Sequence, residues 1–306
     1  MSETLLFEAP AAQEPEAIVE RALKGHAPSK AFVLLSGGKD STVVADWWAR
    51  HSKILRELNL LKSEVAVLHI NTGIGLRSTR NFAETFCRER GIEFHEAHAP
   101  IAYEDLVRRG WRSFDGTRQR GFPGPAAHLF AYTWLKERAL DAFVSLQKDH
   151  RLDNIMLVTG VRLEESSRRM GTTQEVKKDG SKIWVAPLAN FSNADMAEHR
   201  ERYSVPMSPA SSTLHFSAEC LCGAFGDPQE LDMIDTFHGD DEGLAVPRIR
   251  ALQVEMENAG VERCRWATDI RGDKRATEAP GPLCVGCWKQ SKLFAGVTAP
   301  VGGAPE

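Results

Sequence analysis

The sequence predicts an α/β fold in which a doubly wound, mainly parallel sheet is followed by a smaller, helical, cysteine-rich module. Short apolar runs typical of buried parallel strands alternate with segments of helical periodicity over the first two thirds of the chain. From about residue 210 onward the strand signals end, and four of the six cysteines fall there in two pairs. The 306 residues suffice for one large α/β domain and a small appended module.

The first half of the chain opens with an amphipathic helix and continues with three strands and two further helices. The run AFVLL at 31–35 ends in Ser-Gly-Gly, as a buried strand does before a turn. Valine and tryptophan then recur at helical spacing beyond Asp40, and Gly91 stops the helix that follows the second strand. The expected elements are a helix over 14–24, a strand over 31–35, a helix after residue 40, a strand over 65–70, a helix over 79–90 and a strand over 92–97.

The second half of the chain begins with a loop rich in Gly and Pro at 120–125. The elements expected after it are a long helix over 126–146, strands over 154–159 and 183–186, and helices over 229–237 and 248–259. We therefore divide the chain into a leader with its helix (1–25), an α/β domain (26–209), a cysteine-rich module (210–293) and a Gly/Pro/Ala-rich tail expected to be disordered (294–306).

Composition and charge limit the class of protein. The formal charge of −4 gives no global attraction to nucleic acid or to anionic membranes, although arginines cluster locally at 162–169. The N-terminus is acidic and has no apolar core of signal-peptide length, and no apolar run is long enough to span a bilayer. We therefore expect a cytoplasmic protein. In that reducing setting, paired cysteines indicate metal ligands or redox groups rather than disulfides.

A glycine-rich loop between the first strand and its helix is the clearest functional signal. It consists of Ser36, Gly37, Gly38, Lys39, Asp40 and Ser41. Glycines let the backbone approach phosphate oxygens, and free N–H groups at a helix N-terminus donate to them. Asp40 is suited to hold Mg²⁺. The spacing differs from the Walker loop and from the G-x-G-x-x-G dinucleotide fingerprint. A tight turn without a ligand is the competing interpretation.

Two further segments follow strands and are expected at the same edge of the sheet. One contains Gly160, Arg162, Glu165 and Arg169, whose guanidinium groups suit phosphate or sulfate oxygens. Glu165 would orient an arginine or help hold a metal. The competing interpretation is a solvated, charged helix start.

The other segment is Asn71-Thr72-Gly73, whose polar groups suit a ribose or an adenine edge. An ordinary Asx-type turn is the alternative there.

At the start of the long helix, His128 and Lys136 are weaker candidates to face an anionic ligand, since a lone histidine at a helix start is as often a surface or capping residue.

The two cysteine pairs are Cys220 with Cys222 and Cys284 with Cys287. Thiolates at this spacing can chelate one metal, and two pairs complete a tetrahedral set that suits zinc or an iron–sulfur cluster. Cys264 lies between the pairs and is a possible replacement ligand. A redox-active dithiol and unconnected cysteines are the alternatives.

The glycine loop resembles that of the PP-loop, or adenine-nucleotide α-hydrolase-like, superfamily. Three other stretches narrow the resemblance to its phosphoadenosine phosphosulfate (PAPS) reductase branch: Asn71-Thr72-Gly73, where that branch usually has Asp-Thr-Gly; the G-x-R-x-x-E-S-x-x-R pattern of 160–169; and Pro187-Leu188. The resemblance covers about residues 31–190. It implies a HUP-like fold that binds an adenine nucleotide (ATP, PAPS or adenosine 5′-phosphosulfate) with Mg²⁺, and an enzyme that is a transferase or an oxidoreductase.

The resemblance assigns residues to roles. The catalytic candidates are Lys39, Asp40 and Arg162. The nucleotide- and phosphate-binding candidates are the loop 36–41, Asn71, Thr72, Gly73, Gly160, Arg162, Glu165 and Arg169. The spacing of the cysteines, rather than the resemblance, makes Cys220, Cys222, Cys284 and Cys287 the metal candidates.

The chain departs from the true sulfonucleotide reductases in its cysteines. Those enzymes carry a nucleophilic cysteine in a C-terminal E-C-G-x-H motif, and this chain has no cysteine after Cys287. The cysteine-rich module is more similar to that of the DNA-phosphorothioation sulfur-transfer relatives. We therefore expect adenylation or sulfur-transfer chemistry with a sulfur donor. The alternatives are a reductase that releases sulfite with a thioredoxin-like reductant, and a non-catalytic nucleotide- or nucleic-acid-binding subunit with a zinc module.

Overall fold

The computed structural model of the protein describes residues 14–57, 65–112, 116–165, 174–239 and 245–267. Predictions that fall outside these ranges concern Arg169, Cys284, Cys287, most of the leader and the tail from residue 294. The side chain of Glu165 also lies outside the described set.

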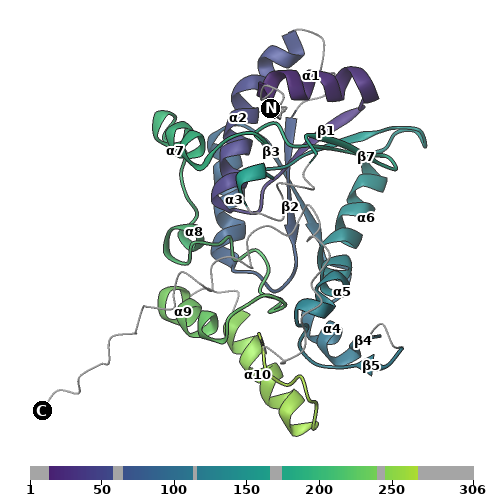
Figure 1. Ribbon diagram of the computed structural model, residues 1–306, viewed down its shortest axis with the longest axis vertical. Coiled ribbons are helices and arrows are strands. Elements are labelled where there is room, and N and C mark those ends of the chain that lie inside the picture. Colours follow the sequence, from purple (N-terminus) through teal and green to yellow (C-terminus); the bar gives the residue numbers. More distant parts are fainter. Residues whose placement is uncertain (1–13, 58–64, 113–115, 166–173, 240–244, 268–306) are drawn as a thin grey trace, which may run out of the picture.

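A six-stranded sheet forms the centre of the molecule, in the order β3-β2-β1-β6-β8-β7. All neighbouring strands are parallel except β7 and β8, which pair antiparallel. The predicted mainly parallel α/β fold is therefore confirmed (Figure 1). The strands are β1 (Lys30–Leu34), β2 (Val65–Asn71), β3 (Glu93–His98), β6 (Ile155–Val158), β7 (Val176–Asp179) and β8 (Lys182–Val185), with a separate hairpin of β4 (Trp111–Arg112) and β5 (Arg118–Gln119).

Helices cover both faces of the sheet. They are α1 (Pro15–His26), α2 (Lys39–Glu57), α3 (Arg77–Glu89), α4 (Tyr103–Arg109), α5 (His128–Tyr132), α6 (Arg138–Gln147), α7 (Asn193–Arg202), α8 (Pro209–Thr213), α9 (Pro228–His238) and α10 (Ala245–Asn258). Short 3-10 segments are η1 (Pro125–Ala127) and η3 (Leu163–Glu165), and η2 (Thr133–Glu137) is a π-helical turn.

Alternate residues along β1 explain the two layers. Val33 points to the face packed against α1, α2, α3 and α7, whereas Phe32 points to the face packed against α5 and α6. Because successive strand side chains point to opposite faces, a continuous apolar run buries both. This is the reason that the apolar runs predicted the strands.

A third apolar cluster lies beyond the carboxyl ends of the strands. It joins residues of 74–135 to residues of 210–267, including Tyr103 from α4, Leu214 after α8 and Ile249 from α10. Residues on both sides of position 209/210 thus share one core. The division of the chain at that position stays a prediction.

The long helix predicted over 126–146 is present but not uniform. It is composed of η1, α5, η2 and α6 in succession, so that a π-helical turn occupies its middle. Within the described ranges, no helix combines the length and the apolar composition needed to cross a membrane.

Candidate active site

The order of the strands defines where a ligand site is expected. From β1 the chain builds outward through β2 and β3, and then crosses to the other side of β1 to add β6 and β8. Open α/β sheets bind ligands at the carboxyl ends of the strands on either side of such a switch. The glycine loop follows β1 and the segment from Gly160 follows β6, so both lie at this point.

The glycine loop is shaped by its own hydroxyl groups. Ser41 Oγ and Thr42 Oγ1 both donate to the carbonyl of Gly38, at 3.0 and 2.9 Å. Ser36 Oγ lies 3.0 Å from Ser41 Oγ. These short contacts fold the loop tightly onto the first turn of α2, the helix end at which backbone N–H groups attract anions.

Gly37 is required by the geometry of the loop. Its φ of +75° is a conformation that residues with a side chain rarely adopt. A Cβ at this position would lie 2.7 Å from Cγ2 of Thr79 at the start of α3. The loop therefore approaches α3 as closely as a glycine allows.

Two serines from the distant part of the chain hold the same loop. Ser208 and Ser211 each donate their hydroxyl to the carbonyl of Gly37, at 2.7 and 2.9 Å. Both side chains are buried. The segment around α8 is thus a structural part of the loop, although no local pattern in the sequence pointed to it.

Asp40 and Arg162 form a buried ion pair between the two predicted segments. The Nη2 atom of Arg162 lies 3.0 Å from Oδ2 of Asp40, and the arginine also donates to the carbonyl of Phe191 and to Asn193. Gly160 packs directly on the backbone, since a Cβ there would lie 2.9 Å from Ser41 N. The segment after β6 therefore braces the glycine loop.

One carboxylate oxygen of Asp40 takes no part in the ion pair with Arg162. Within the described part of the chain, Oδ1 of Asp40 is buried and has no hydrogen-bond partner. A buried carboxylate oxygen without a donor costs free energy unless a ligand satisfies it. Lys39, the neighbouring candidate, has an exposed side chain.

Arg200 of α7 also reaches the loop and was not predicted. Its Nη2 donates to the carbonyl of Lys39 at 3.2 Å, whereas its buried Nε has no partner among the described residues. Burial lowers the pKa of Arg200 below its ordinary value, with Arg162 adding to the shift and Asp40 opposing it. The sequence signal was weak because Arg200 lies beyond Pro187-Leu188, the last stretch that matches a family pattern.

The end of β2 forms an Asx-type turn, the alternative interpretation of Asn71-Thr72-Gly73. Oδ1 of Asn71 accepts from Gly73 N at 2.8 Å, and its amide donates to Glu96 at 2.7 Å. Thr72 is buried and donates to the carbonyl of Glu219 at 2.8 Å. Contact of these residues with a ribose or adenine stays a prediction.

A cavity of about 460 Å³ opens beside this turn. It is lined by His69, Asn71, Gly73, Gly75, Leu76, Arg77, Arg80, Asn81, Glu219 and Arg248. Its histidine donates from Nδ1 to the carbonyl of Leu35 at 2.8 Å, next to the glycine loop. Arginines from α3 and α10 thus line a cavity at the edge of the site.

The acidic member of that lining is held by a buried lysine. Lys136 Nζ lies 2.6 Å from Oε2 of Glu219, and both side chains are less than a tenth exposed. Lys136 belongs to the π-helical turn, which directs it inward. Its contact is with Glu219, and contact of Lys136 or His128 with an anionic ligand stays a prediction.

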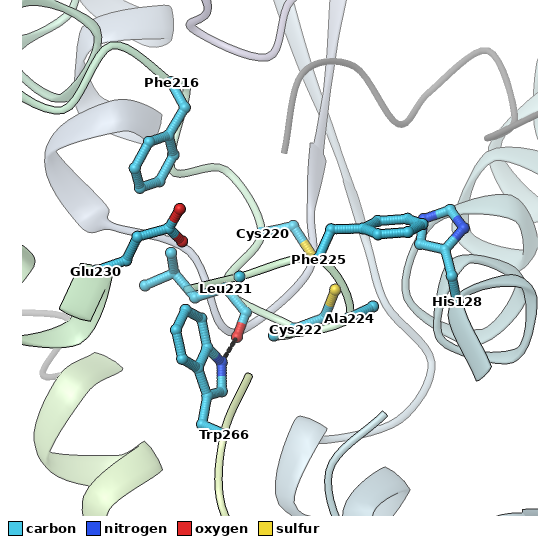
Figure 2. Close-up of a pocket in the computed structure, with 11 residues that line it drawn as sticks. His128, Phe216, Cys220, Leu221, Cys222, Ala224, Phe225, Glu230 and Trp266 are labelled. Atoms are coloured by element: carbon cyan, nitrogen blue, oxygen red, sulfur yellow. Dashed lines mark hydrogen bonds between the residues drawn. The ribbon is translucent and has the colours of Figure 1, made fainter. Parts of the chain in front are cut away.

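The first cysteine pair lies in a compact loop (Figure 2). Cys220 and Cys222 border a small space of about 20 Å³, on the side of the loop that faces Phe225 and His128. Trp266 donates from Nε1 to the carbonyl of Leu221 at 2.7 Å. Because its indole covers the turn, a Cβ at Gly223, whose φ is +79°, would lie 2.7 Å from that nitrogen.

The described residues supply two of the four predicted metal ligands. In these ranges no group of three or more His, Cys, Asp or Glu side chains is arranged to hold a metal ion. Tyr103 donates to the carbonyl of Cys222 at 2.8 Å, and burial, together with the two nearby thiols, raises its pKa well above the ordinary value. A four-cysteine centre stays a prediction.

The fold, the glycine loop at the switch point and the bracing segment after β6 define a PP-loop protein. Residues 30–211 match the profile described as phosphoadenosine phosphosulfate reductase domain, which is more than half of the 306 residues. The chain belongs to the PAPS reductase domain family.

Other comparisons add resemblances. A comparison with curated proteins finds no match. PAPS reductase from Candida auris in a phosphate complex is similar at 13% identity, over 65% of this chain and 84% of that chain, with a TM-score of 0.44. FMN adenylyltransferase from Candida glabrata with FMN and the ATP analogue AMPCPP is similar at 12% identity, over 68% and 65%, with a TM-score of 0.40.

The U34-tRNA thiolase NcsA from Methanococcus maripaludis with its 4Fe-4S cluster is similar at 17% identity, over 78% and 79%, with a TM-score of 0.37. Likenesses at this level do not decide among reactions.

Proposed function

We propose that the protein is a PAPS-reductase-like PP-loop enzyme that binds ATP or an adenosine phosphosulfate and acts in adenylation or sulfur transfer. The observation that carries this proposal is Oδ1 of Asp40 at the start of α2, which is buried and has no hydrogen-bond partner among the described residues. It lies in a glycine loop at the switch point of the sheet, within a chain of the PAPS reductase domain family.

The loop is suited to the phosphate or pyrophosphate part of the nucleotide. Its backbone is held by Ser208 and Ser211 through the carbonyl of Gly37, so its N–H groups keep their positions when the ligand is absent. A preorganised set of donors binds an anion at a smaller entropic cost. The exposed side chain of Lys39 would add a cation next to the same group.

The residues present fit a Mg²⁺ ion bound with the nucleotide. Hard cations prefer carboxylate oxygens. Asp40 offers one oxygen to which no described residue donates, while Arg162 occupies the other. The ion would neutralise charge on the phosphate chain. In this arrangement Arg162 positions Asp40, and Arg200 lies near enough to Asp40 to balance part of its charge.

For adenylation, an acceptor oxygen forms a bond to the α-phosphorus, the bond to the bridging oxygen breaks, and pyrophosphate leaves with its electron pair. The chain's own residues contribute binding, orientation and charge stabilisation at the departing group. The paired cysteines would then hold an iron–sulfur cluster or zinc, with Cys284 and Cys287 completing the ligand set. A cluster would serve a sulfur-transfer role, and zinc would be structural.

The test uses the full-length protein and calorimetric titration with ATP, with and without Mg²⁺. We expect Asp40→Asn to weaken binding of Mg·ATP by at least ten-fold, with a much smaller effect on metal-free ATP. Asp179→Asn, at an exposed aspartate of β7, is the matched control and should bind as the wild type does. Equal affinity of wild type and Asp40→Asn for Mg·ATP would contradict the proposed role of Asp40.

Pyrophosphate release from ATP, dependent on Asp40, would support adenylation. Release of sulfite from PAPS or adenosine 5′-phosphosulfate with a thioredoxin-like reductant would support the reductase alternative. In that reaction the thiolate of Cys220 or Cys287 attacks the sulfur, and AMP leaves from adenosine 5′-phosphosulfate or adenosine 3′,5′-bisphosphate from PAPS. Reduced thioredoxin then releases sulfite and becomes the disulfide. Nucleotide binding without either reaction would favour the binding subunit.

A further inference from the structure

Residues 108–120 concentrate positive charge in a chain whose formal charge is −4. This segment contains five arginines and one aspartate, and it spans the end of α4 and the hairpin of β4 and β5. The hairpin lies beside α4 and α5 at the lower right of Figure 1. A local basic patch of this density can dominate the field at one face even when the whole chain is acidic.

Among the described residues, carboxylates neutralise little of this charge. Arg108 is the exception, because it pairs with Glu255 and Asp105. The remaining arginines of the segment, together with one from α6, are exposed, and none of them forms an ion pair with a described acidic residue. These are Arg109, Arg112, Arg118, Arg120 and Arg138.

The pairing of the hairpin brings two of these charges together. Arg112 stands directly opposite Arg118 in the antiparallel register of β4 and β5. Like charges at such a position destabilise the pair. Their contacts are with backbone carbonyls, to Gly116 from Arg112 and to Arg109 from Arg118. An anionic ligand bound between them would remove this repulsion.

Aromatic rings are interleaved with the arginines. The guanidinium of Arg138 lies 3.6 Å from the centre of the Trp134 ring, and Arg109 lies 5.5 Å from the same ring. Trp134 contacts Phe130, and Phe130 contacts Trp111, with ring centres 6.5 and 5.9 Å apart. The result is a continuous row of flat groups in which stacked guanidinium groups present both a plane and a charge.

The π-helical turn directs side chains of one helix to two different faces of the molecule. Trp134 contacts Phe130 and Arg109, whereas Lys136, two residues later in η2, is buried against Glu219. His128, in α5 of the same helix, lines the cysteine loop. The row of rings and charges therefore lies on the outer side of a helix whose inner side reaches both the cavity and the cysteines.

We infer that this surface, which we call the arginine–tryptophan surface, binds single-stranded nucleic acid. We define it as Arg109, Arg112, Arg118, Arg120 and Arg138 with the partly exposed rings of Phe130 and Trp134. Trp111 is buried and supports Phe130 from the interior. Exposed arginines attract the phosphodiester backbone, and aromatic or guanidinium planes stack on bases that a duplex keeps covered. The inference goes beyond the proposed function and does not depend on it.

The experiment measures binding of fluorescently labelled 20-nucleotide single strands, as RNA and as DNA, to the full-length protein by anisotropy over a series of salt concentrations. We expect binding whose affinity falls with salt, and a salt slope that is about 1.4 shallower in Arg112→Ala/Arg118→Ala, since each lost phosphate contact contributes about 0.7 on single strands. Trp134→Ala should weaken binding by roughly five-fold or more through lost stacking.

The matched control is Lys177→Ala/Lys178→Ala, which removes two exposed cations from β7 at another edge of the molecule. It should bind as the wild type does. Arg138→Ala repeats the test on α6 if the hairpin variant unfolds, as judged by circular dichroism. The inference is overturned if wild type binds neither strand, or if the control loses as much affinity as the hairpin variant. It is also overturned if Trp134→Ala has no effect while duplex DNA and heparin bind as well as single strands, because simple polyanion attraction then suffices.

Discussion

Asp40 and Arg162 form a buried ion pair that joins the loop after β1 to the segment after β6, with their side chains 8% and 1% exposed. The pair lies at the switch point between β1 and β6, where the order in which the chain adds strands reverses. Removing one partner of such a pair leaves an uncompensated charge in the interior, whereas removing both leaves none. The two residues therefore hold the site together before any ligand binds.

A double-mutant cycle tests this relationship. We expect Asp40→Ala and Arg162→Met each to lower the free energy of unfolding by about 3 kcal/mol, because each leaves a buried charge alone. The double variant should lose clearly less than the sum, while nucleotide binding stays impaired because the oxygen of Asp40 is absent. Urea denaturation gives the energies. Additive losses would show that the pair contributes nothing beyond its separate residues.

Gly37 gives a second test, of the shape of the loop. Gly37→Ala places a Cβ at a φ of +75° and 2.7 Å from Cγ2 of Thr79. We expect a loss of about 2 kcal/mol in stability and a larger loss in nucleotide affinity. Thr79→Ser removes the clashing methyl group and can keep the 2.7 Å bond to the carbonyl of Ser217. Combined with Gly37→Ala, Thr79→Ser should therefore recover part of the lost stability. If nothing is recovered, the loss comes from the backbone conformation of Gly37 alone.

The sequence predicted the sheet well because local patterns encode it. The run 31–35 reads as a buried strand since both faces of β1 are covered, and β1 occupies Lys30–Leu34. The edge strand β7 and the hairpin of β4 and β5 were missed because they are short and polar. The π-helical turn within the long helix was missed because the residues around Thr133 keep a helical pattern.

The predicted backbone segments lie together, whereas several of the side-chain contacts that hold them were not predicted. The loop and Gly160 meet as expected, since the carboxyl ends of neighbouring parallel strands share one edge. The serines that hold Gly37 are about 170 residues away in sequence, and Arg200 belongs to no recognised pattern. Such long-range contacts depend on packing, which no local spacing encodes.

Asp46 provides a test of pH dependence. Burial alone would raise its pKa, but hydrogen bonds from His199, Arg50 and Arg90 lower the pKa to about 2 from 3.8. Since the folded pKa lies below the unfolded one, this stabilisation is complete above about pH 4 and is lost as the pH falls toward 2. We expect Asp46 to contribute about 2 kcal/mol to that loss.

Urea denaturation at pH values between 5 and 2 gives the measurement. Asp46→Asn should be less stable than wild type at pH 5 and should lose stability less steeply below pH 4. An exposed aspartate, Asp179, gives the control, since Asp179→Asn should follow the wild-type curve. Parallel curves for wild type and Asp46→Asn would contradict the assignment.

The cysteines can be ranked by their reactivity toward iodoacetamide. Cys87 is fully buried, and burial raises the pKa of its thiol to about 12. We expect it to remain unmodified until the protein unfolds, because the thiolate is the reactive form. Cys220, Cys222 and Cys264 are partly accessible, so in chelator-treated, reduced protein they should be alkylated, as mass spectrometry of peptides would report.

Metal loading then distinguishes the possible ligand sets. If the four predicted cysteines bind one metal, Cys220, Cys222, Cys284 and Cys287 become protected together, since coordinated thiolates do not react freely, and Cys264 does not. Protection of Cys264 in place of one of the four would make it the replacement ligand. The Cys264→Ser variant checks this, because it should keep the full metal content only in the first case. If loading with zinc or iron and sulfide protects none of these residues, the pairs are not a metal centre. The turn closed by Trp266 then serves packing alone.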